Sequence, residues 1–251
     1  MSALIRSEFR KLFSTKAWIG LLLGAMALTA LSVSLLIPFA GDPNSGLPAL
    51  EDPLAQQLIL STPANSAIFV VILGIMGITQ EFRHRTATPT FLTTPSRVKV
   101  VVAKLITYLV IGLGFAVVTL LVVLAIAIPW LASRDVTLSL GGDNTEVVAG
   151  ALAVCTIYAL VGVGVGTLVR NQVGAIVGIL AYLFVAEPII RAVPATADFY
   201  RWLPGGAVEA MTATFQNPEL LGAWQGAALL IGYGLVAAGL AMALTLQRDV
   251  H

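Results

Sequence analysis

Residue types that carry out catalysis are scarce in this chain of 251 residues. It contains one cysteine, Cys155, and two histidines, His84 and His251. A single cysteine excludes an internal disulfide and a metal site built from several cysteines, and Cys155 lies in an apolar run, where we expect a small packing residue. Neither histidine lies in an apolar segment, so we expect neither a serine-protease arrangement nor a histidine-rich proton relay.

Motifs for zinc hydrolysis and nucleotide binding are also missing. The sequence has no H-E-x-x-H and no G-x-x-x-x-G-K-[ST], so the chain cannot bind and hydrolyse ATP through a phosphate loop. Glu187 is the exception in otherwise apolar segments, where a charge costs about 2.5–3.5 kcal/mol. Because Pro188 follows it and Arg191 is one turn away, we expect Glu187 to be capped or paired at the outer lip of its segment; a substrate or proton site is the alternative. We expect no catalytic residue, metal or cofactor on this chain.

One short charged segment has the residue types for docking another protein. It reads Gln80-Glu81-Phe82-Arg83-His84-Arg85-Thr86 and is followed by Pro95-Ser96-Arg97. Charges of both signs suit a protein interface. The alternative is that these cations only fix the orientation of the chain and contact lipid head groups.

Apolar helices must position these residues. Hydrophobic residues make up 58% of the chain and charged residues 11%, whereas soluble domains have about 25% charged residues. About 20 apolar residues are needed to cross a bilayer as a helix, and six segments have about that length. They cover about 18–39, 60–80, 103–130, 147–168, 173–190 and 222–246. Pro63 and Asn65 interrupt the second. We predict one all-α transmembrane domain over residues 1–251.

The cationic residues predict the orientation of these spans. With the N-terminus in the cytoplasm, 11 of the 14 Lys and Arg residues fall on the inner side and three, Arg134, Arg191 and Arg201, on the outer side. Inner loops of membrane proteins are enriched in Lys and Arg. We therefore expect both termini in the cytoplasm and the chain in the plasma (inner) membrane. The net charge of +1 is too small to indicate nucleic-acid binding.

Two regions outside the spans have their own patterns. In residues 1–16, Ile5, Phe9, Leu12 and Phe13 share one helical face and cations cover the other, which predicts an amphipathic helix along the membrane surface. A topogenic charged flank is the alternative. The outer segment 191–221 is rich in aromatic and apolar residues, which indicates that it dips into the membrane or packs on the mouth of the bundle. We expect Pro204-Gly205-Gly206 to break any helix there.

Glycine pairs with G-x-x-x-G spacing occur in several spans. They are Gly20/Gly24, Gly162/Gly166, Gly174/Gly178 and Gly222/Gly226. Small residues let membrane helices approach closely. The pairs predict a tightly packed bundle or a contact between subunits, without choosing between the two.

An interfacial helix, six spans, a charged first cytoplasmic loop and a semi-apolar last outer loop together resemble the membrane subunit of a type-2 ABC exporter, the small bacterial permease class. The segment from Gln80 to Thr86, with Pro95-Ser96-Arg97 and Lys104, is similar to the pattern of that family: an acid, an aromatic residue, Arg, a small residue and Thr, then Pro-x-Arg and a Lys that opens the third span. Arg85 stands where Gly is common in the family.

The resemblance implies a division of labour between chains. The permease would pair with a second copy or a paralogue, and two separate ATPase subunits, which hold ATP and Mg, would bind from the cytoplasm. The cargo would be lipophilic or amphipathic, such as a drug, lipid or peptide, and would pass between the two permeases along apolar side chains of the second and fifth spans.

The resemblance also implies roles for individual segments. The first 16 residues would be the connecting helix, and Arg170 and Asn171 would form a second, smaller ATPase contact. The outer segment would be a re-entrant hairpin, with Trp202, Leu203, Pro204 and Gly205 at the outer gate. The coupling helix that docks into the ATPase would consist of Glu81, Phe82, Arg83, His84, Arg85 and Thr86.

Two other functions share this topology. A non-transporting membrane protein, such as an immunity or sensor-anchor protein, would not need residues 81–86 for coupling. A small membrane enzyme acting on lipids would need a cluster of carboxylates or histidines, which the sequence lacks.

Overall fold

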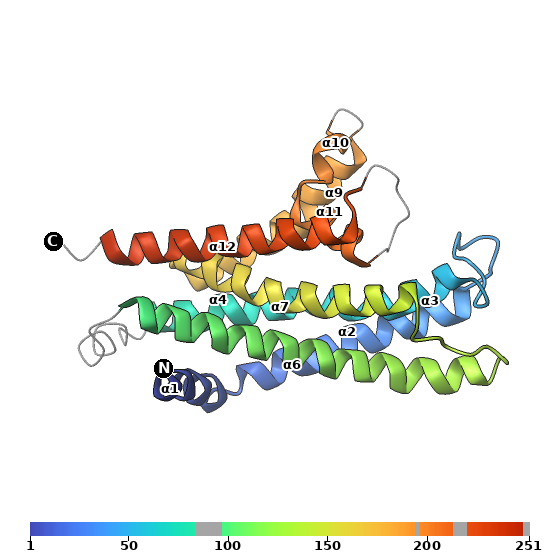
Figure 1. Cartoon of the computed structure of the whole chain (residues 1–251), viewed down its shortest axis with the longest axis horizontal. Coiled ribbons are helices and arrows are strands. Elements are labelled where there is room, and N and C mark those ends of the chain that lie inside the picture. Colours follow the sequence, from blue (N-terminus) through green and yellow to red (C-terminus); the bar gives the residue numbers. More distant parts are fainter. Residues whose placement is uncertain (84–96, 194–195, 213–219, 248–251) are drawn as a thin grey trace.

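The structure is a computed structural model that describes residues 1–83, 97–193, 196–212 and 220–247; side chains are described within these ranges except at 81–83, 97–98, 197, 238, 241–242 and 244–247. All the regular elements of these ranges are helices (Figure 1). In chain order they are α1 (Ser2–Ser14), α2 (Ala17–Phe39), α3 (Pro53–Ser61), the 3₁₀ helix η1 (Thr62–Ser66), α4 (Ala67–Arg83), α6 (Arg97–Ala132), α7 (Asp143–Val169), α8 (Gln172–Ala181), the π-helix η2 (Tyr182–Ala186), α9 (Glu187–Ala192), α10 (Ala197–Tyr200), α11 (Pro204–Thr212) and α12 (Ala223–Gln247).

Five stretches of the described chain are long and apolar enough to cross a membrane, as expected for a multi-pass membrane protein. They are Ala17–Phe39, Pro53–Gln80, Lys99–Ala132, Asp143–Val169 and Gln172–Ala192. Each contains one of the first five predicted spans and is longer than it. The described apolar stretch of α12, Ala223–Ala237, is shorter than these five.

α7 lies at the centre of the bundle and packs against α4, α6, α11 and α12 (Figure 1). In an 18-residue apolar window of the second and fourth spans, 67% and 61% of the residues are buried, whereas in those of the first and fifth spans only 17% and 11% are buried. α4 and α7 approach closely because Gly162 faces the backbone of Val71 and Gly166 faces Ile75 and Ile78. The Gly162/Gly166 pair therefore serves packing within the chain.

Two spans depart from regular α-helix where proline occurs. η1 contains Pro63 and Asn65, the residues that interrupt the second predicted span. In the fifth span, η2 comes directly before Glu187-Pro188. Pro188 cannot donate a backbone hydrogen bond and its ring crowds the carbonyl four residues earlier, so the wider turn of η2 accommodates it. Such π-bulges are frequent at functional sites.

The predicted N-terminal helix is present as α1, and one side of it packs against the rest of the chain. The structure buries Glu8 and Leu12, which are four residues apart and share one face. Ile5 and Phe9 are only half-buried, and Phe13 is 49% exposed. α1 packs against the first part of α6 at the end of the bundle where α4 ends, so a charged residue lies within its packed face.

Candidate functional site

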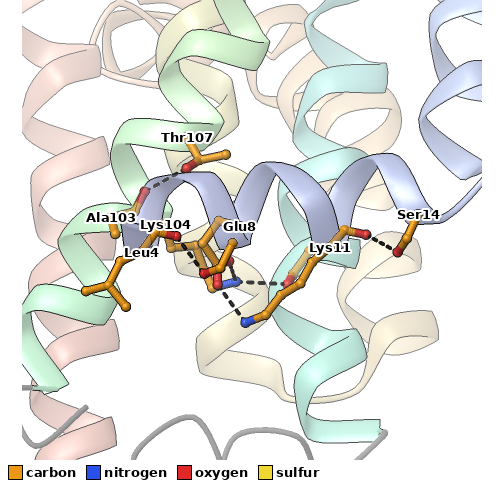
Figure 2. Close-up of polar contacts among 9 residues, drawn as sticks. Leu4, Glu8, Lys11, Ser14, Ala103, Lys104 and Thr107 are labelled. Atoms are coloured by element: carbon orange, nitrogen blue, oxygen red, sulfur yellow. Dashed lines mark hydrogen bonds and ion pairs between the residues drawn. The ribbon is translucent and has the colours of Figure 1, made fainter. Parts of the chain in front are cut away.

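A buried ion pair joins α1 to the third span (Figure 2). Lys104 of α6 donates a hydrogen bond from Nζ to Oε2 of Glu8 at 2.5 Å, and Lys11 contacts the other carboxylate oxygen, Oε1, at 2.6 Å. The side chains of Glu8 and Lys104 are 5% and 4% exposed. Burial by itself raises the pKa of the Glu8 carboxyl, but the Lys104 ammonium and then Lys11 outweigh burial and hold this pKa below its ordinary value. Glu8 is therefore a carboxylate at neutral pH.

The same lysine reaches a third helix. Lys104 Nζ also lies 3.3 Å from the carbonyl oxygen of Gly77 on α4, to which it donates. Gly77 lets α4 and α6 approach here, since a Cβ at this position would overlap the ring and hydroxyl of Tyr108. Because Gly77 lies about one helical turn before Glu81, the ion pair ties α1 and α6 to the part of α4 that leads into the predicted coupling segment. We call Glu8, Lys11, Gly77 and Lys104 the inner junction.

The predicted coupling residues fall only partly within the described chain. The backbone of Glu81, Phe82 and Arg83 forms the last turn of α4. His84, Arg85 and Thr86 lie outside the described residues. The proposed role of the segment stays a prediction.

The predicted second contact forms a tight turn between two spans. Arg170 ends α7 in the left-handed conformation, with φ of 54°. Asn171 starts α8 by accepting a hydrogen bond from the backbone N–H of Gly174 on its side-chain oxygen, at 3.0 Å. The turn thus has a defined structure between the end of the fourth span and the start of the fifth.

Of the predicted outer-gate residues, Trp202 and Leu203 lie between α10 and α11, and Pro204 and Gly205 form the start of α11. The carbonyl of Trp202 accepts a hydrogen bond from the hydroxyl of Tyr233 on α12 at 2.7 Å, and that of Leu203 accepts one from the N–H of Ala207 at 3.0 Å. The expectation that Pro204-Gly205-Gly206 breaks a helix is wrong, because α11 begins at Pro204. Proline is tolerated in the first turn of a helix, where its missing N–H would have no partner in any case.

Two carboxylates fix this outer region. Oε1 of Glu187 accepts hydrogen bonds from the hydroxyl of Tyr182 and the backbone N–H of Gly205, each at 2.8 Å. Oε1 of Glu209 accepts hydrogen bonds from Arg191 at 2.6 Å and from the hydroxyl of Tyr200 at 2.9 Å. Glu187 is therefore capped as expected, by the first turn of α11.

A cavity of about 920 Å³ lies beside these carboxylates. Its lining comes from α2, the loop after it, α3, η1, α7, the fifth span, α10 and α11. Glu187, Tyr200, Gly205 and Glu209 form part of its wall, and Thr62 and Asn65 of η1 form another part. We call this the outer cavity, after the side of the membrane on which the predicted orientation places it. The second span thus runs from the outer cavity, at η1, to the inner junction, at Gly77.

Neither region has the constitution of a catalytic centre for metal chemistry. The described residues contain no group of three His, Cys, Asp or Glu side chains that could hold a metal ion. Cys155 is buried, as expected, and its thiol donates to the carbonyl of Pro63 at 3.3 Å. The inner junction joins three helices through an ion pair and a hydrogen bond, and the outer cavity has both apolar and polar lining residues.

Comparisons with known proteins identify no family for this chain. A scan against protein-family models gave no match, and a search of curated proteins gave no significant match.

Sequence reasoning missed the inner junction. The sequence marks Lys104 as the lysine that opens the third span, and nothing in it pairs this lysine with Glu8. One signal was present: Glu8 is the only acidic residue before Asp42, and Lys104 lies in an apolar run. Charges in such positions are costly without a partner.

Proposed function

We propose that this chain is the membrane-spanning permease subunit of an ATP-driven exporter of the type-2 ABC class. It would form the translocation pathway as a dimer, with an identical or related permease, and take its energy from two separate ATPase subunits at residues 81–86. The observation that carries the proposal is the inner junction, because the Glu8–Lys104 pair and the Gly77 carbonyl join the connecting helix, the third span and the end of the second span.

The inner junction would let α1, α4 and α6 move together as one rigid unit. A force applied just after Arg83 acts on α4 within two turns of a point where three helices are bound to one another, so they move together. α4 continues through η1, whose Thr62 and Asn65 line the outer cavity. A displacement at the inner end is thus carried along one span to the place where cargo would lie.

The finer topology of the proposal has six spans, with both termini in the cytoplasm of a bacterium and the chain in its inner membrane. α12 is the sixth span; its 25 residues are enough for a crossing. α10 and α11 form the re-entrant outer hairpin. The hydrogen bonds that the Gly205 N–H donates to Glu187 and the Tyr233 hydroxyl donates to the Trp202 carbonyl hold this hairpin against the fifth and sixth spans.

A second permease copy would use the exposed fifth span. Only 11% of the residues in its 18-residue apolar window are buried. Val173, Val177 and Phe184 are 71%, 59% and 66% exposed. A Cβ at Gly178 would meet nothing within the chain. An apolar helix that its own bundle leaves bare, with small residues on it, suits helix association in lipid.

The proposal is tested by affinity purification of the tagged chain at native expression, with proteins identified by mass spectrometry and ATP hydrolysis measured. We expect a separate ATPase subunit in the purified complex and Mg-ATP hydrolysis that the chain alone lacks. Recovery of the intact chain without any ATPase would favour the non-transporting immunity or sensor-anchor protein. Turnover of a lipid by the chain alone would favour an enzyme.

A further inference from the structure

The outer cavity combines apolar walls with charge of one sign. Its volume of about 920 Å³ lies in the range of about 300–1,000 Å³ that is usual for small-molecule sites. Leu36 and Phe39 of α2 and Leu58 of α3 supply apolar wall. Among the described lining residues the charged side chains are Glu187 and Glu209, and none is cationic.

The two carboxylates differ in how their charge is balanced. Glu209 is paired with Arg191 at 2.6 Å. Glu187 is only 5% exposed, and in the part of the chain that the structure describes its hydrogen-bond partners, the Tyr182 hydroxyl and the Gly205 N–H, are both neutral. A buried carboxylate without a counter-charge is unfavourable. The cavity beside it is large enough to admit one.

We propose that the outer cavity binds a hydrophobic organic cation and that the Glu187 carboxylate is its counter-charge. The apolar walls take up the hydrophobic body, and the aromatic residue Tyr158 also lines the cavity. Tyr200 lines it too, but its ring already carries the Arg191 guanidinium, 5.6 Å from the ring centre. That this cation is the exported cargo rests on the proposed function; that it binds does not.

Other ligand classes fit the same cavity less well. The phosphate of a phospholipid would bring negative charge beside two carboxylates and no cationic lining residue among those described. An inorganic cation such as Ca²⁺ needs six to eight oxygen ligands, whereas much of this lining is apolar. A neutral hydrophobic molecule would fill the volume but leave Glu187 without a counter-charge.

The proposal is tested by equilibrium binding of tetraphenylphosphonium to the purified full chain in phosphatidylcholine nanodiscs, with empty nanodiscs as background. Tetraphenylborate has the same shape and the opposite charge. We expect saturable binding of the cation, no competition by the anion, and at least a tenfold loss of affinity in Glu187→Gln. Glu146→Gln removes an exposed acidic residue near the start of α7, outside the cavity lining, and should bind as the unmodified chain does.

A second variant covers the case in which Glu187→Gln does not fold. Phe39 lines the cavity at the end of α2 and is 50% exposed, so Phe39→Lys adds a positive charge at a tolerant position. It should also weaken cation binding at least tenfold. The proposal is wrong if binding does not exceed that of empty nanodiscs, if tetraphenylborate competes equally, or if folded Glu187→Gln binds unchanged. Because no ATPase takes part, such a failure leaves the permease proposal to its own test.

Discussion

At the scale of single residues, the most informative contact is the one between Glu8 and Lys104. A buried ion pair contributes little net stability, because the desolvation of two charges offsets their attraction. Its value is positional, since each charge becomes costly when the other is removed. Glu8 and Lys104 therefore hold α1 in one place on α6, next to the end of the second span.

Removing one partner should destabilise the chain strongly. We expect Lys104→Met to lower the free energy of unfolding by about 3–5 kcal/mol, because Glu8 keeps its buried charge and retains only the partly exposed Lys11. The double variant Glu8→Leu/Lys104→Met should recover most of this loss. Thermal unfolding in detergent measures both, and Lys99→Met, an exposed residue of α6, is the control. Equal stability of Lys104→Met and Lys99→Met would contradict the account.

The same pair predicts a dependence of stability on pH. The pKa of Glu8 is lower in the folded chain than its ordinary value of 4.5, so its stabilising contribution is fully present above that value. It is lost as the pH falls through the lowered pKa, when the carboxylate becomes protonated. We expect the difference in melting temperature between the unmodified chain and Glu8→Gln to shrink below about pH 4.5. A difference that stays constant down to pH 3 would show that Glu8 is not held as a carboxylate.

The pairing of these two residues could not be predicted from the sequence. Glu8 and Lys104 belong to helices that are adjacent only in the fold, and the predicted apolar face of the first helix omitted Glu8 because a helical wheel sorts residues by polarity. Glu187 stood out at once, since it interrupts an apolar span. The hydrogen bond that Glu187 accepts from the Gly205 N–H could not be predicted, because the sequence indicated no helix starting at Pro204.

At the scale of elements, close packing of α4 on α7 forms the centre of the bundle. Gly162 and Gly166 lie on the face of α7 that contacts α4, where side chains would force the backbones apart. This packing makes the second and fourth spans one unit, so α4 moves with the core and not independently of it. The outer cavity and the inner junction are therefore connected by a stiff element.

A methyl group at this contact should weaken the bundle. In Gly162→Ala the new Cβ would meet the carbonyl of Val71, which belongs to the backbone and cannot rotate away. We expect a loss of about 1–3 kcal/mol in the free energy of unfolding. Gly114→Ala on α6 meets nothing within the chain and should be neutral or slightly stabilising. Chemical unfolding measures the free energy of unfolding of both variants. Equal values for Gly162→Ala and Gly114→Ala would mean that α4 and α7 are not packed this closely.

The first five spans could be predicted because lipid imposes a length of about 20 apolar residues. The break at Pro63 was also predicted, and η1 lies there. The π-helix before Pro188 was not, because a proline can be accommodated by a kink, a break or a bulge, and the surrounding packing selects among them. The expectation that Pro204-Gly205-Gly206 breaks any helix was wrong for a related reason. A proline in the middle of a helix disrupts it, but a proline in the first turn is favoured, and the sequence did not distinguish the two positions.

At the scale of the whole molecule, the candidate membrane-spanning helices are buried to very different degrees. Two of its spans, the first and the fifth, are largely bare, while the second and fourth are enclosed. Lipid can cover bare apolar helices, so exposure alone does not require a partner. The open face of α8, with Gly174 and Gly178, favours a second copy of the chain or a related permease on this side.

Cross-linking tests this arrangement. In a Cys155→Ala background, Val177→Cys places a thiol on the exposed face of α8, where two copies related by a two-fold axis would meet. We expect a disulfide-linked dimer in membranes after mild oxidation. Leu121→Cys, on a similarly exposed position of α6, should stay monomeric. If both variants cross-link equally, or only Leu121→Cys does, the fifth span is not the dimer contact.

The central claim is that a separate ATPase docks at the end of the second span. The most direct measurement is the amount of ATPase that co-purifies with the chain at native expression, compared between the unmodified chain, Glu81→Ala/Arg83→Ala and Arg134→Ala, whose change lies on the predicted outer side. The account predicts at least a tenfold weaker association for the double variant, about 1.4 kcal/mol, and normal recovery with Arg134→Ala. Equal recovery of ATPase with the double variant and the unmodified chain, at equal expression, would contradict it.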